Sequence, residues 1–272
     1  MMKKDFVSIM KVCVLVSLVM LLCYVSGCKK SSTEEGNGNS AQPSMSEHPS
    51  ASEHPSAKPA ATPDNNVTKS TAPAGMVPIE IKLPKPMFVG TPQSTTVANL
   101  EKPLGKPRPP FLAPAGTTNV ALGKPVTSSD EEPIIGDIEM ITDGDMEAAD
   151  GSYVELGPFV QHVTVDLGAM HEIYAIVVWH YHKQARVYFD VIVQVADDPD
   201  FITNVRTLFN NDIDNSLGLG VGKNMHYTET AEGKLIDAKG VRARYVRLHS
   251  NGSTGSDANH YIEVEVYGKA VK

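Results

Sequence analysis

The sequence predicts an all-β domain, a β-sandwich or jelly roll, over residues 116–272. Two observations support this prediction. Runs of β-branched and aromatic residues recur at short intervals, and clusters of Gly, Asn, Asp and Pro separate them. In addition, no long stretch of this region has the apolar repeat of an amphipathic helix. Many short strands joined by turns and larger loops are typical of sandwiches and jelly rolls.

Five segments have the clearest strand composition, and turn clusters such as ADDPD and NGSTGSDAN lie between them. Side chains two residues apart on a strand share a face, so Trp179 shares a face with Val177, and we expect it in the core rather than as an exposed platform. The stretch WHYHKQAR that begins at Trp179 is expected at the tip of a hairpin. The five segments are HVTVDL (162–167), EIYAIVVWHY (172–181), VYFDVIVQVA (187–196), RARYVRLHS (242–250) and YIEVEVYG (261–268).

Composition limits the kinds of protein that the chain can be. Its 272 residues carry a formal net charge of −8, and 41% of them are hydrophobic. This length suffices for one ordinary domain and additional segments. Proteins whose main task is to bind nucleic acid usually present a basic face, so the net negative charge disfavours nucleic acid as a partner.

The first residues resemble the signal peptide of a bacterial lipoprotein. Two lysines precede a short apolar run, VCVLVSLVMLLCY (12–24), and VSGC (25–28) follows it. A positive start and a short apolar core are typical of secretory signal peptides. The ending is similar to a lipobox, which implies that residues 1–27 are removed and that Cys28 carries the lipid; an uncleaved anchor is the alternative. We therefore expect a lipid-anchored protein of the bacterial cell envelope, at the outer membrane or cell surface, with the membrane as partner through the lipid.

Two segments of biased composition precede the predicted domain. Residues 28–78 are rich in Ser, Pro, Ala and Glu and nearly free of large apolar residues, so we expect a disordered tether. Residues 79–115 place prolines every few positions between Ile, Leu, Met and Phe. Because proline lacks an amide donor and biases the preceding residue to extended backbone, we expect an extended strap that packs on the domain. One short edge strand is expected within it, at residues 79–83.

The predicted domain is similar, nearly throughout, to the discoidin family, also called F5/8 type C or galactose-binding-like. The resemblance implies an eight-stranded antiparallel jelly-roll sandwich. It further implies that the N- and C-terminal segments lie close together and that loops at one end bind the ligand. It rests on NVALGKPVTSS (119–129), ITDGD (141–145), VTVDLG (163–168), YAIVVW (174–179), FDVIVQVADDPDF (189–201), ARYVRLHS (243–250) and YIEVEVYG (261–268), in this order.

The resemblance also implies a structural Ca²⁺, which many bacterial relatives hold. Ca²⁺ takes about six to eight oxygen ligands, many of them backbone carbonyls in turns, and ITDGD supplies a turn in which Gly144 allows the bend. A plain Asp-Gly turn without an ion is the alternative. The implied ligands are the carboxylates of Asp143 and Glu263 and the backbone oxygens of Met140, Asp145, Ile262 and Ala148, the last where relatives often have a hydroxyl residue.

Sugar-binding relatives place a His or Trp, an Arg and an Asn near this turn, and the present sequence matches that pattern only in part. An aromatic ring covers the apolar face of a sugar, while charged and amide groups bind its hydroxyls. Ordinary hydrogen bonding at strand ends is the alternative for the histidines. The nominated ligand-binding residues are Tyr153, His180, Tyr181, His182, Arg186, His226, Tyr227, Asn259 and His260.

These features predict a non-catalytic binding protein. No cysteine follows Cys28, and the sequence has no GxSxG or HExxH motif and no recognisable acid/base pair. We expect a lipid-anchored surface protein whose domain binds carbohydrate. The alternative is a protein-interaction or scaffold module at the cell envelope, with the strap and the long loop 209–233 as its interface.

Overall fold

The computed structural model describes residues 73–87, 97–147, 149 and 151–271, which belong to a compact unit that spans residues 67–272. Every strand pair is antiparallel, so the predicted all-β class is confirmed. The elements are β1 (Met76–Pro78), β2 (Leu112–Pro114), β3 (Thr118–Asn119), β4 (Val126–Ser128), the 3-10 helix η1 (Ile138–Thr142), β5 (Val154–Pro158), β6 (Gln161–Trp179), β7 (Ile192–Ala196), β8 (Arg206–Asn210), β9 (Lys234–Ser250), β10 (Ala258–Tyr261) and β11 (Glu263–Ala270).

The expected signal peptide, lipidated Cys28 and most of the tether lie outside the described residues. Within the described ranges, none of the helices has the length and apolar character needed to cross a membrane.

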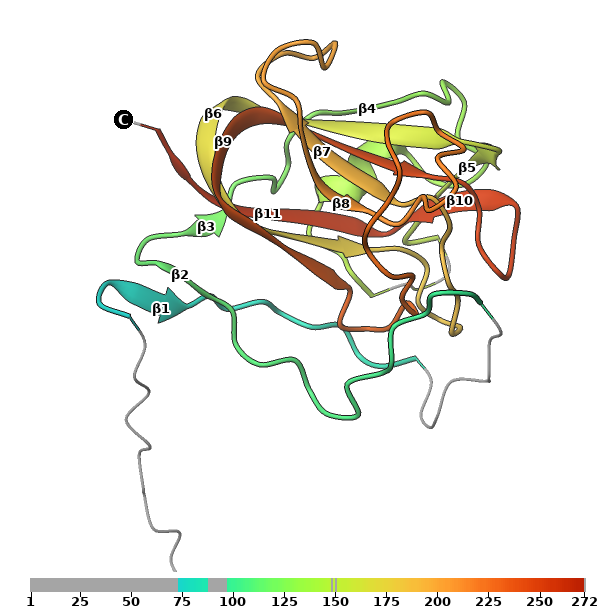
Figure 1. Ribbon diagram of the computed structural model, residues 1–272, viewed down its shortest axis with the longest axis horizontal. Helices are drawn as coiled ribbons and strands as arrows, with labels where there is room; N and C mark the ends of the chain where they lie inside the picture. The colour runs from blue at the N-terminus through green and yellow to red at the C-terminus, as the bar shows by residue number, and fades with distance from the viewer. Residues whose placement is uncertain (1–72, 88–96, 148, 150, 272) are drawn as a thin grey trace, which may run out of the picture. The chain divides into compact units, whose positions relative to one another are not determined.

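Two long strands, β6 and β9, pair along most of their length and connect the two layers of the fold (Figure 1). The register is interrupted between Asp166 and His171 and again between Ile173 and Ala175. At the first interruption Gly168 has a φ of 82°, a conformation that favours glycine, and the paired strands bend there. The first half of β6 has β4 as its other neighbour, whereas the second half has β11. Each long strand therefore belongs to both layers of a sandwich.

The remaining strands extend these two layers. β7 pairs with the second half of β9 and with β8, and β3 pairs with β11. The pairing of β3 with β11 brings the start and the end of the sandwich together, as the discoidin resemblance implied. β5 and β10 form a separate pair.

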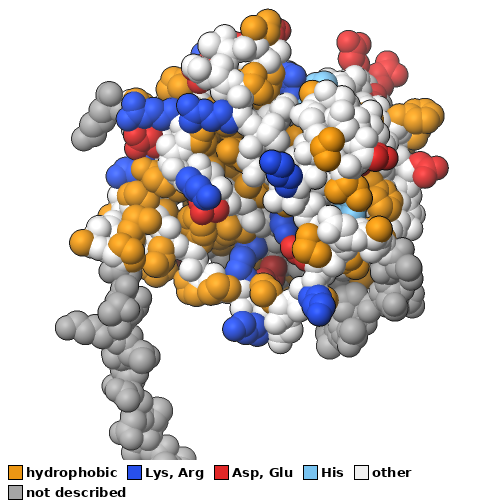
Figure 2. All heavy atoms as spheres, in the orientation of Figure 1, with side chains coloured by type: hydrophobic (Ala, Val, Ile, Leu, Met, Phe, Trp, Pro, Cys, Tyr) orange, Lys and Arg blue, Asp and Glu red, His pale blue; other side chains and the backbone are white. Residues whose placement is uncertain are grey.

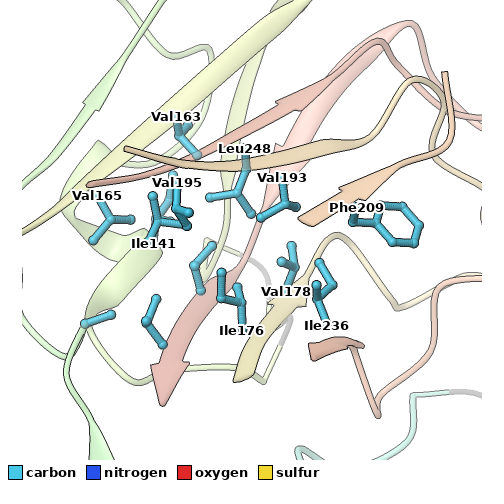
Figure 3. Close-up of a cluster of buried hydrophobic side chains, with 14 of the residues drawn as sticks. Ile141, Val163, Val165, Ile176, Val178, Val193, Val195, Phe209, Ile236 and Leu248 are labelled. Carbon is cyan, nitrogen blue, oxygen red and sulfur yellow. The ribbon is translucent and has the colours of Figure 1, made fainter. Parts of the chain in front are cut away.

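The main hydrophobic core fills the space between the layers (Figure 3). Val163 and Val165 from the first half of β6 lie opposite Ile176 and Val178 from its second half. Burial of such a side chain stabilises the fold by about 1.5–3 kcal/mol. The other labelled core residues, at most 5% exposed, are Ile141, Val193, Val195, Phe209, Ile236 and Leu248.

The strap packs on the opposite face of the β6–β11 layer, as its apolar composition predicted. Ile79 and Ala113 from the two limbs of the strap are buried in one cluster with Val177 and Trp179. The Trp179 indole is fully buried and its Nε1 donates a hydrogen bond to the carbonyl oxygen of Ala231 at 3.0 Å. The core position predicted for this tryptophan is thus confirmed.

The short strand predicted at residues 79–83 is wrong. The strap does contain a strand pair, but it is β1 with β2, and residues 79–83 that follow β1 are extended without a ladder. Ile79 still donates its amide to the carbonyl of Phe111 at 2.9 Å. Beyond that bond the opposite limb, residues 107–110, contains three prolines, which lack amide donors and end the pairing.

Gly233 should be sensitive to substitution because it packs on Trp179. A Cβ at Gly233 would lie 2.8 Å from the indole ring, and its φ is 63°. Gly218 has a similar φ of 70°, but nothing lies within 4 Å of an added Cβ, so it is the matched control. We expect Gly218→Ala to cost about 1–2 kcal/mol of unfolding free energy from backbone strain alone, and Gly233→Ala about 1–3 kcal/mol more. Equal losses in urea denaturation would contradict this packing.

Candidate functional site

Four of the nine nominated residues lie on the connection between β6 and β7. The predicted hairpin is wrong, because β6 and β7 both pair with β9, which lies between them. Residues 180–191 form the connection. Its backbone is held by other loops: Val187 bridges to Thr228, and Glu229 donates its amide to the carbonyl of Arg186 at 2.7 Å. The connection therefore lies between loops that are distant in sequence.

Four nominated side chains converge at this end of the sandwich: Tyr153, Tyr181, Arg186 and His260. We call them the aromatic cluster. The rings of Tyr153 and Tyr181 are 5.1 Å apart, and the guanidinium of Arg186 lies 4.7 Å from the centre of the Tyr181 ring. The His260 ring lies 5.8 Å from Tyr181 and 6.0 Å from Tyr153. His260 is buried, whereas the other three side chains are half-buried.

His260 presents a hydrogen-bond acceptor to the cluster. Burial lowers the pKa of His260 to about 4, with smaller contributions from the charges of Arg186 and His180, so the ring is neutral at physiological pH. Its Nε2 lies 3.1 Å from a carboxylate oxygen of Glu155. Because a carboxylate only accepts, Nε2 carries the proton and Nδ1 is the acceptor. Nδ1 is buried and has no hydrogen-bond partner among the described residues.

Arg186 supplies the complementary donors. Its Nε and Nη1 are buried without a partner in the described residues, while Nη2 donates to the side-chain oxygen of Gln184 at 3.4 Å. A Cβ on Gly255 would lie 2.8 Å from Nε, so the loop that contains Gly255 closes over the guanidinium. A buried donor without a partner costs about 1–3 kcal/mol, so both groups favour an additional hydrogen-bond acceptor.

His180 belongs to a buried polar centre next to the cluster, not to the exposed rim. Its Nδ1 lies 3.0 Å from a carboxylate oxygen of Glu229 and 3.4 Å from the hydroxyl of Tyr227, and its ring stacks on Tyr188 at 4.4 Å. Nε2 of His180 and Oε1 of Glu229 are buried without partners in the described residues, whereas the hydroxyl of Tyr188 lies near Arg186 and the backbone of Tyr181. This centre packs against the cluster because the Tyr188 ring lies 6.1 Å from His260.

Two other nominated histidines serve internal packing. His182 is fully buried, and its Nε2 lies 2.9 Å from the carbonyl oxygen of Met146. His226 is 5% exposed, packs edge-on against Phe189 at 5.8 Å, and bridges through its backbone to Leu100 of the strap. Neither side chain is among the four that converge.

Asn259 acts as a latch between two loops. It is fully buried, and its Oδ1 accepts hydrogen bonds from the hydroxyl of Ser250 and the amide of Gly252, both at 2.8 Å. Its Nδ2 donates to the carbonyls of Gly157 at 2.9 Å and Phe159 at 2.8 Å. The side chain is thus fully used within the protein, which leaves it no free group for the ligand expected from the sequence.

The implied calcium turn is joined to β11 at Glu263. The amide of Gly144 donates to Oε2 of Glu263 at 3.1 Å, while Oε1 is buried without a partner in the described residues. Burial raises the pKa of Glu263 to about 9, and the charges of Glu265, Asp143 and Asp145 add to the rise. A buried carboxylate beside other acidic groups fits a divalent cation, which would offset both the burial and the repulsion.

The other implied calcium ligands differ in how exposed they are. Asp143 and Asp145 are exposed, and each accepts an amide hydrogen bond from the residue two positions further on, at 2.8 and 3.0 Å. Met140 is half-buried in η1, and Ile262 is buried between β10 and β11. Ala148 lies outside the described residues.

A different acidic group forms the tightest set of potential metal ligands. In the described part of the chain, Asp190, Asp212 and Asp214 are the one set of three or more His, Asp or Glu residues whose ligand atoms lie within 4.8 Å of one another. Asp212 is fully buried and accepts amide hydrogen bonds from Ser216 at 2.9 Å and Leu217 at 3.0 Å. These hydrogen bonds show that Asp212 stabilises its own loop. The nominated histidines do not gather into such a set.

Sequence reasoning missed three residues that shape the site: Glu155, Tyr188 and Glu229. Glu155 faces His260 because β5 pairs with β10, and neither short strand was predicted at those bounds. Glu229 reaches His180 from 49 positions away. Tyr188 was visible in an apolar run, but its stacking on His180 has no signal in the sequence.

No family model matches the chain, and no curated protein sequence matches it. Solved structures do match. One is a family 89 glycoside hydrolase from Clostridium perfringens in complex with GlcNAc-α-1,4-galactose, at a TM-score of 0.43 and 21% identity, over 56% of the present chain and 15% of the hydrolase. The chain therefore spans only a small part of that enzyme.

Two smaller structures match over most of their own length. Chitosan-binding module 1 from a chitosanase/glucanase of Paenibacillus sp. IK-5 matches at a TM-score of 0.38 and 21% identity, over 56% of the present chain and 99% of the module. A fucose-binding module from Streptococcus pneumoniae matches at a TM-score of 0.40 and 20% identity, over 56% of the chain and 96% of the module. At these identities the similarity concerns the fold alone.

The latch role of Asn259 predicts a large loss of stability on truncation. Asn259→Ala removes four hydrogen bonds and leaves buried partners unpaired, so we expect a loss of about 2–4 kcal/mol in urea denaturation. Asn251→Ala, which removes one bond to Asp190, is the matched control and should cost about 1 kcal/mol or less. If the two variants lose the same stability, Asn259 is not the latch.

Proposed function

We propose that the aromatic cluster binds a carbohydrate without catalysis. The observation that carries the proposal is the set of groups that meet there: two half-buried tyrosine rings, one acceptor on His260 and donors on Arg186. A sugar ring presents the complementary set, an apolar face and neighbouring hydroxyls that can each donate and accept. One hydroxyl can then accept from the guanidinium and donate to the imidazole.

The cluster is suited to recognition because its polar groups are held in place. Arg186 lies over the Tyr181 ring, and the carboxylate of Glu155 fixes the orientation and the tautomer of His260. Glu155 is thereby engaged with the histidine instead of facing a second carboxylate across a ligand. This arrangement supports binding rather than the paired-carboxylate chemistry of sugar hydrolysis.

A structural Ca²⁺ is part of the proposal. Glu263 and Asp143 would hold it through carboxylates, together with backbone oxygens of the turn that contains Gly144. The buried and unpartnered Oε1 of Glu263 supports this assignment. When bound, the ion would neutralise the acidic groups and fix the turn against β11.

Attachment to the cell envelope completes the proposed function. The lipobox-like VSGC supports lipidation of Cys28, and residues 28–78 would then tether the domain to the membrane, outside the bilayer. The mass of the N-terminal peptide of the mature protein tests this directly, because a diacylglyceryl cysteine and a lost leader are both measurable.

Substitution of Arg186 tests the sugar site. A glycan array with the mature protein identifies a ligand, and calorimetry then compares variants with the wild type. We expect Arg186→Gln and Tyr181→Ala to weaken binding at least tenfold, about 1.4 kcal/mol or more, because each removes a group that the sugar contacts. Arg206→Gln removes an exposed arginine on β8 and should leave binding unchanged. Absence of any glycan ligand, or full affinity in Arg186→Gln, would contradict the proposal.

Thermal unfolding tests the Ca²⁺ site. At a hundredfold excess over Kd, Ca²⁺ should stabilise the fold by about 2.7 kcal/mol and raise Tm by about 5–10 °C relative to EDTA. Glu263→Gln should abolish this rise, yet be about as stable as the wild type in EDTA, because without the ion the Glu263 carboxyl, with its pKa raised to about 9, is itself neutral. Glu265→Gln, two residues further along β11, is the control and should keep the rise. An equal rise in both variants would show that Glu263 is not a ligand.

A further inference from the structure

The strap forms a groove with the loop that leads into β9. A pocket of about 560 Å³ lies between residues 101–108 of the strap and residues 227–235. A second pocket of about 400 Å³ lies between the two limbs of the strap, and both pockets are lined by Arg108 and Glu232. We call the two adjoining pockets the strap groove. Figure 2 shows Lys and Arg side chains around a hollowed part of this face.

Both pockets of the strap groove have apolar walls. Met87, Leu104 and Leu235 line the first, together with prolines of the strap. Ile81 and Phe111 line the second, again with several prolines. Pockets of this size and lining accept apolar side chains.

Arg108 lies between the two pockets, next to Glu232. Arg108 is half-buried, and this burial lowers its pKa. Its Nη1 donates to the carbonyl of Gly233 at 3.0 Å, and its backbone amide donates to the carboxylate of Glu232. Among the described residues, no carboxylate oxygen lies within ion-pair distance of its guanidinium. The nearby charge of Glu232 partly offsets the effect of burial on this pKa, but a partly desolvated guanidinium that belongs to no ion pair still favours an incoming carboxylate.

The first pocket has more cations than acids, since Lys102, Lys106, Arg108 and Lys234 line it with Glu101 and Glu232, whereas the second pocket has Glu80 and Glu232 beside Arg108. Lys102 and Lys106 are exposed and line the first pocket. The acidic Glu101 in the same wall is already paired with Lys234 at 2.8 Å. The stretch KPLGKPR (102–108) thus carries three cations and no acid in a chain whose net charge is −8.

The order of these features indicates the kind of ligand. A positive group lies in the middle, with an apolar pocket on each side of it. A fatty acid or lipid carries its charge at one end, and a sugar lacks the apolar side chains that two such pockets would accept. An extended peptide with an acidic residue between apolar ones has the matching order.

We propose that the strap groove binds an extended segment of a partner protein in which an acidic side chain is flanked by apolar ones. The carboxylate pairs with Arg108, and the flanking side chains enter the two pockets. This partner site is separate from the carbohydrate site and adds a second binding function to it.

The groove is preformed, which reduces the entropy lost on binding. The strap is fixed to the domain by the amide of Glu101, which donates to the carbonyl of His226 at 2.8 Å, and by the hydroxyl of Tyr267, which donates to the carbonyl of Glu80 at 3.3 Å.

A peptide array with the mature protein tests this proposal. The probes are capped octapeptides of Leu, Ile, Val and Pro with one or two central Glu or Asp residues, and the same peptides with Gln or Asn. The wild type is expected to bind acidic members at least tenfold more tightly than their amide counterparts. Arg108→Gln should remove this preference, whereas Lys223→Gln, which removes an exposed lysine outside the groove, and Arg186→Gln in the sugar site should retain it.

A second variant keeps the test valid if Arg108→Gln does not fold, as judged by circular dichroism. The double variant Lys102→Gln/Lys106→Gln changes exposed side chains only and should weaken binding of the acidic peptides at least threefold. The proposal is overturned if no acidic peptide binds, or if amide peptides bind equally well. It is also overturned if vesicles of phosphatidylglycerol, and not peptides, bind in a manner that depends on Arg108.

Discussion

The pairing of β6 with β9 is the constraint on which the rest of the structure depends. Both strands pass through the bend near Gly168 and enter both layers, so one continuous pairing fixes how the layers face each other. Val163 and Ile176 belong to the same strand yet meet from opposite sides of the core. In the main sheet, β4, β7 and β11 pair directly with β6 or β9, and β3 and β8 are attached through β11 and β7.

The candidate site is built where β6 ends. Trp179 is the last residue of β6 and packs against the strap. The next residue, His180, belongs to the buried polar centre. Glu263 of β11 pairs with Trp179 of β6. The proposed calcium carboxylate therefore lies one strand away from the start of the connection that carries Tyr181 and Arg186. An ion at Glu263 would therefore stabilise the end of β6, where the connection with Tyr181 and Arg186 begins. The strap groove lies on the outer face of the same layer.

The sequence predicts the architecture well and the site only in part. Strands with dense β-branched runs were found, but 162–167 and 172–181 form one strand, because the Gly168 bend looks like a turn signal. The first half of β9 was missed because two lysines, an aspartate and a glycine interrupt its apolar residues, and β5 and β8 are only five residues long. His180 was nominated for the binding rim, yet it is buried, and its position depends on Glu229 and Tyr188, which pattern and spacing cannot place. The positions of side chains that follow from strand alternation could be predicted, whereas the positions of those held by contacts between loops could not.

Nitrogen-15 NMR of the histidine rings tests the central claim most directly, namely that His260 and Arg186 together receive a sugar hydroxyl. We expect a glycan ligand to move the Nδ1 resonance of His260 upfield, as for an unprotonated nitrogen that accepts a hydrogen bond, while Nε2 stays protonated. The Nε resonance of Arg186 should move in the same titration. If the ligand saturates the protein while both resonances stay unchanged, the sugar binds elsewhere and the assignment is contradicted.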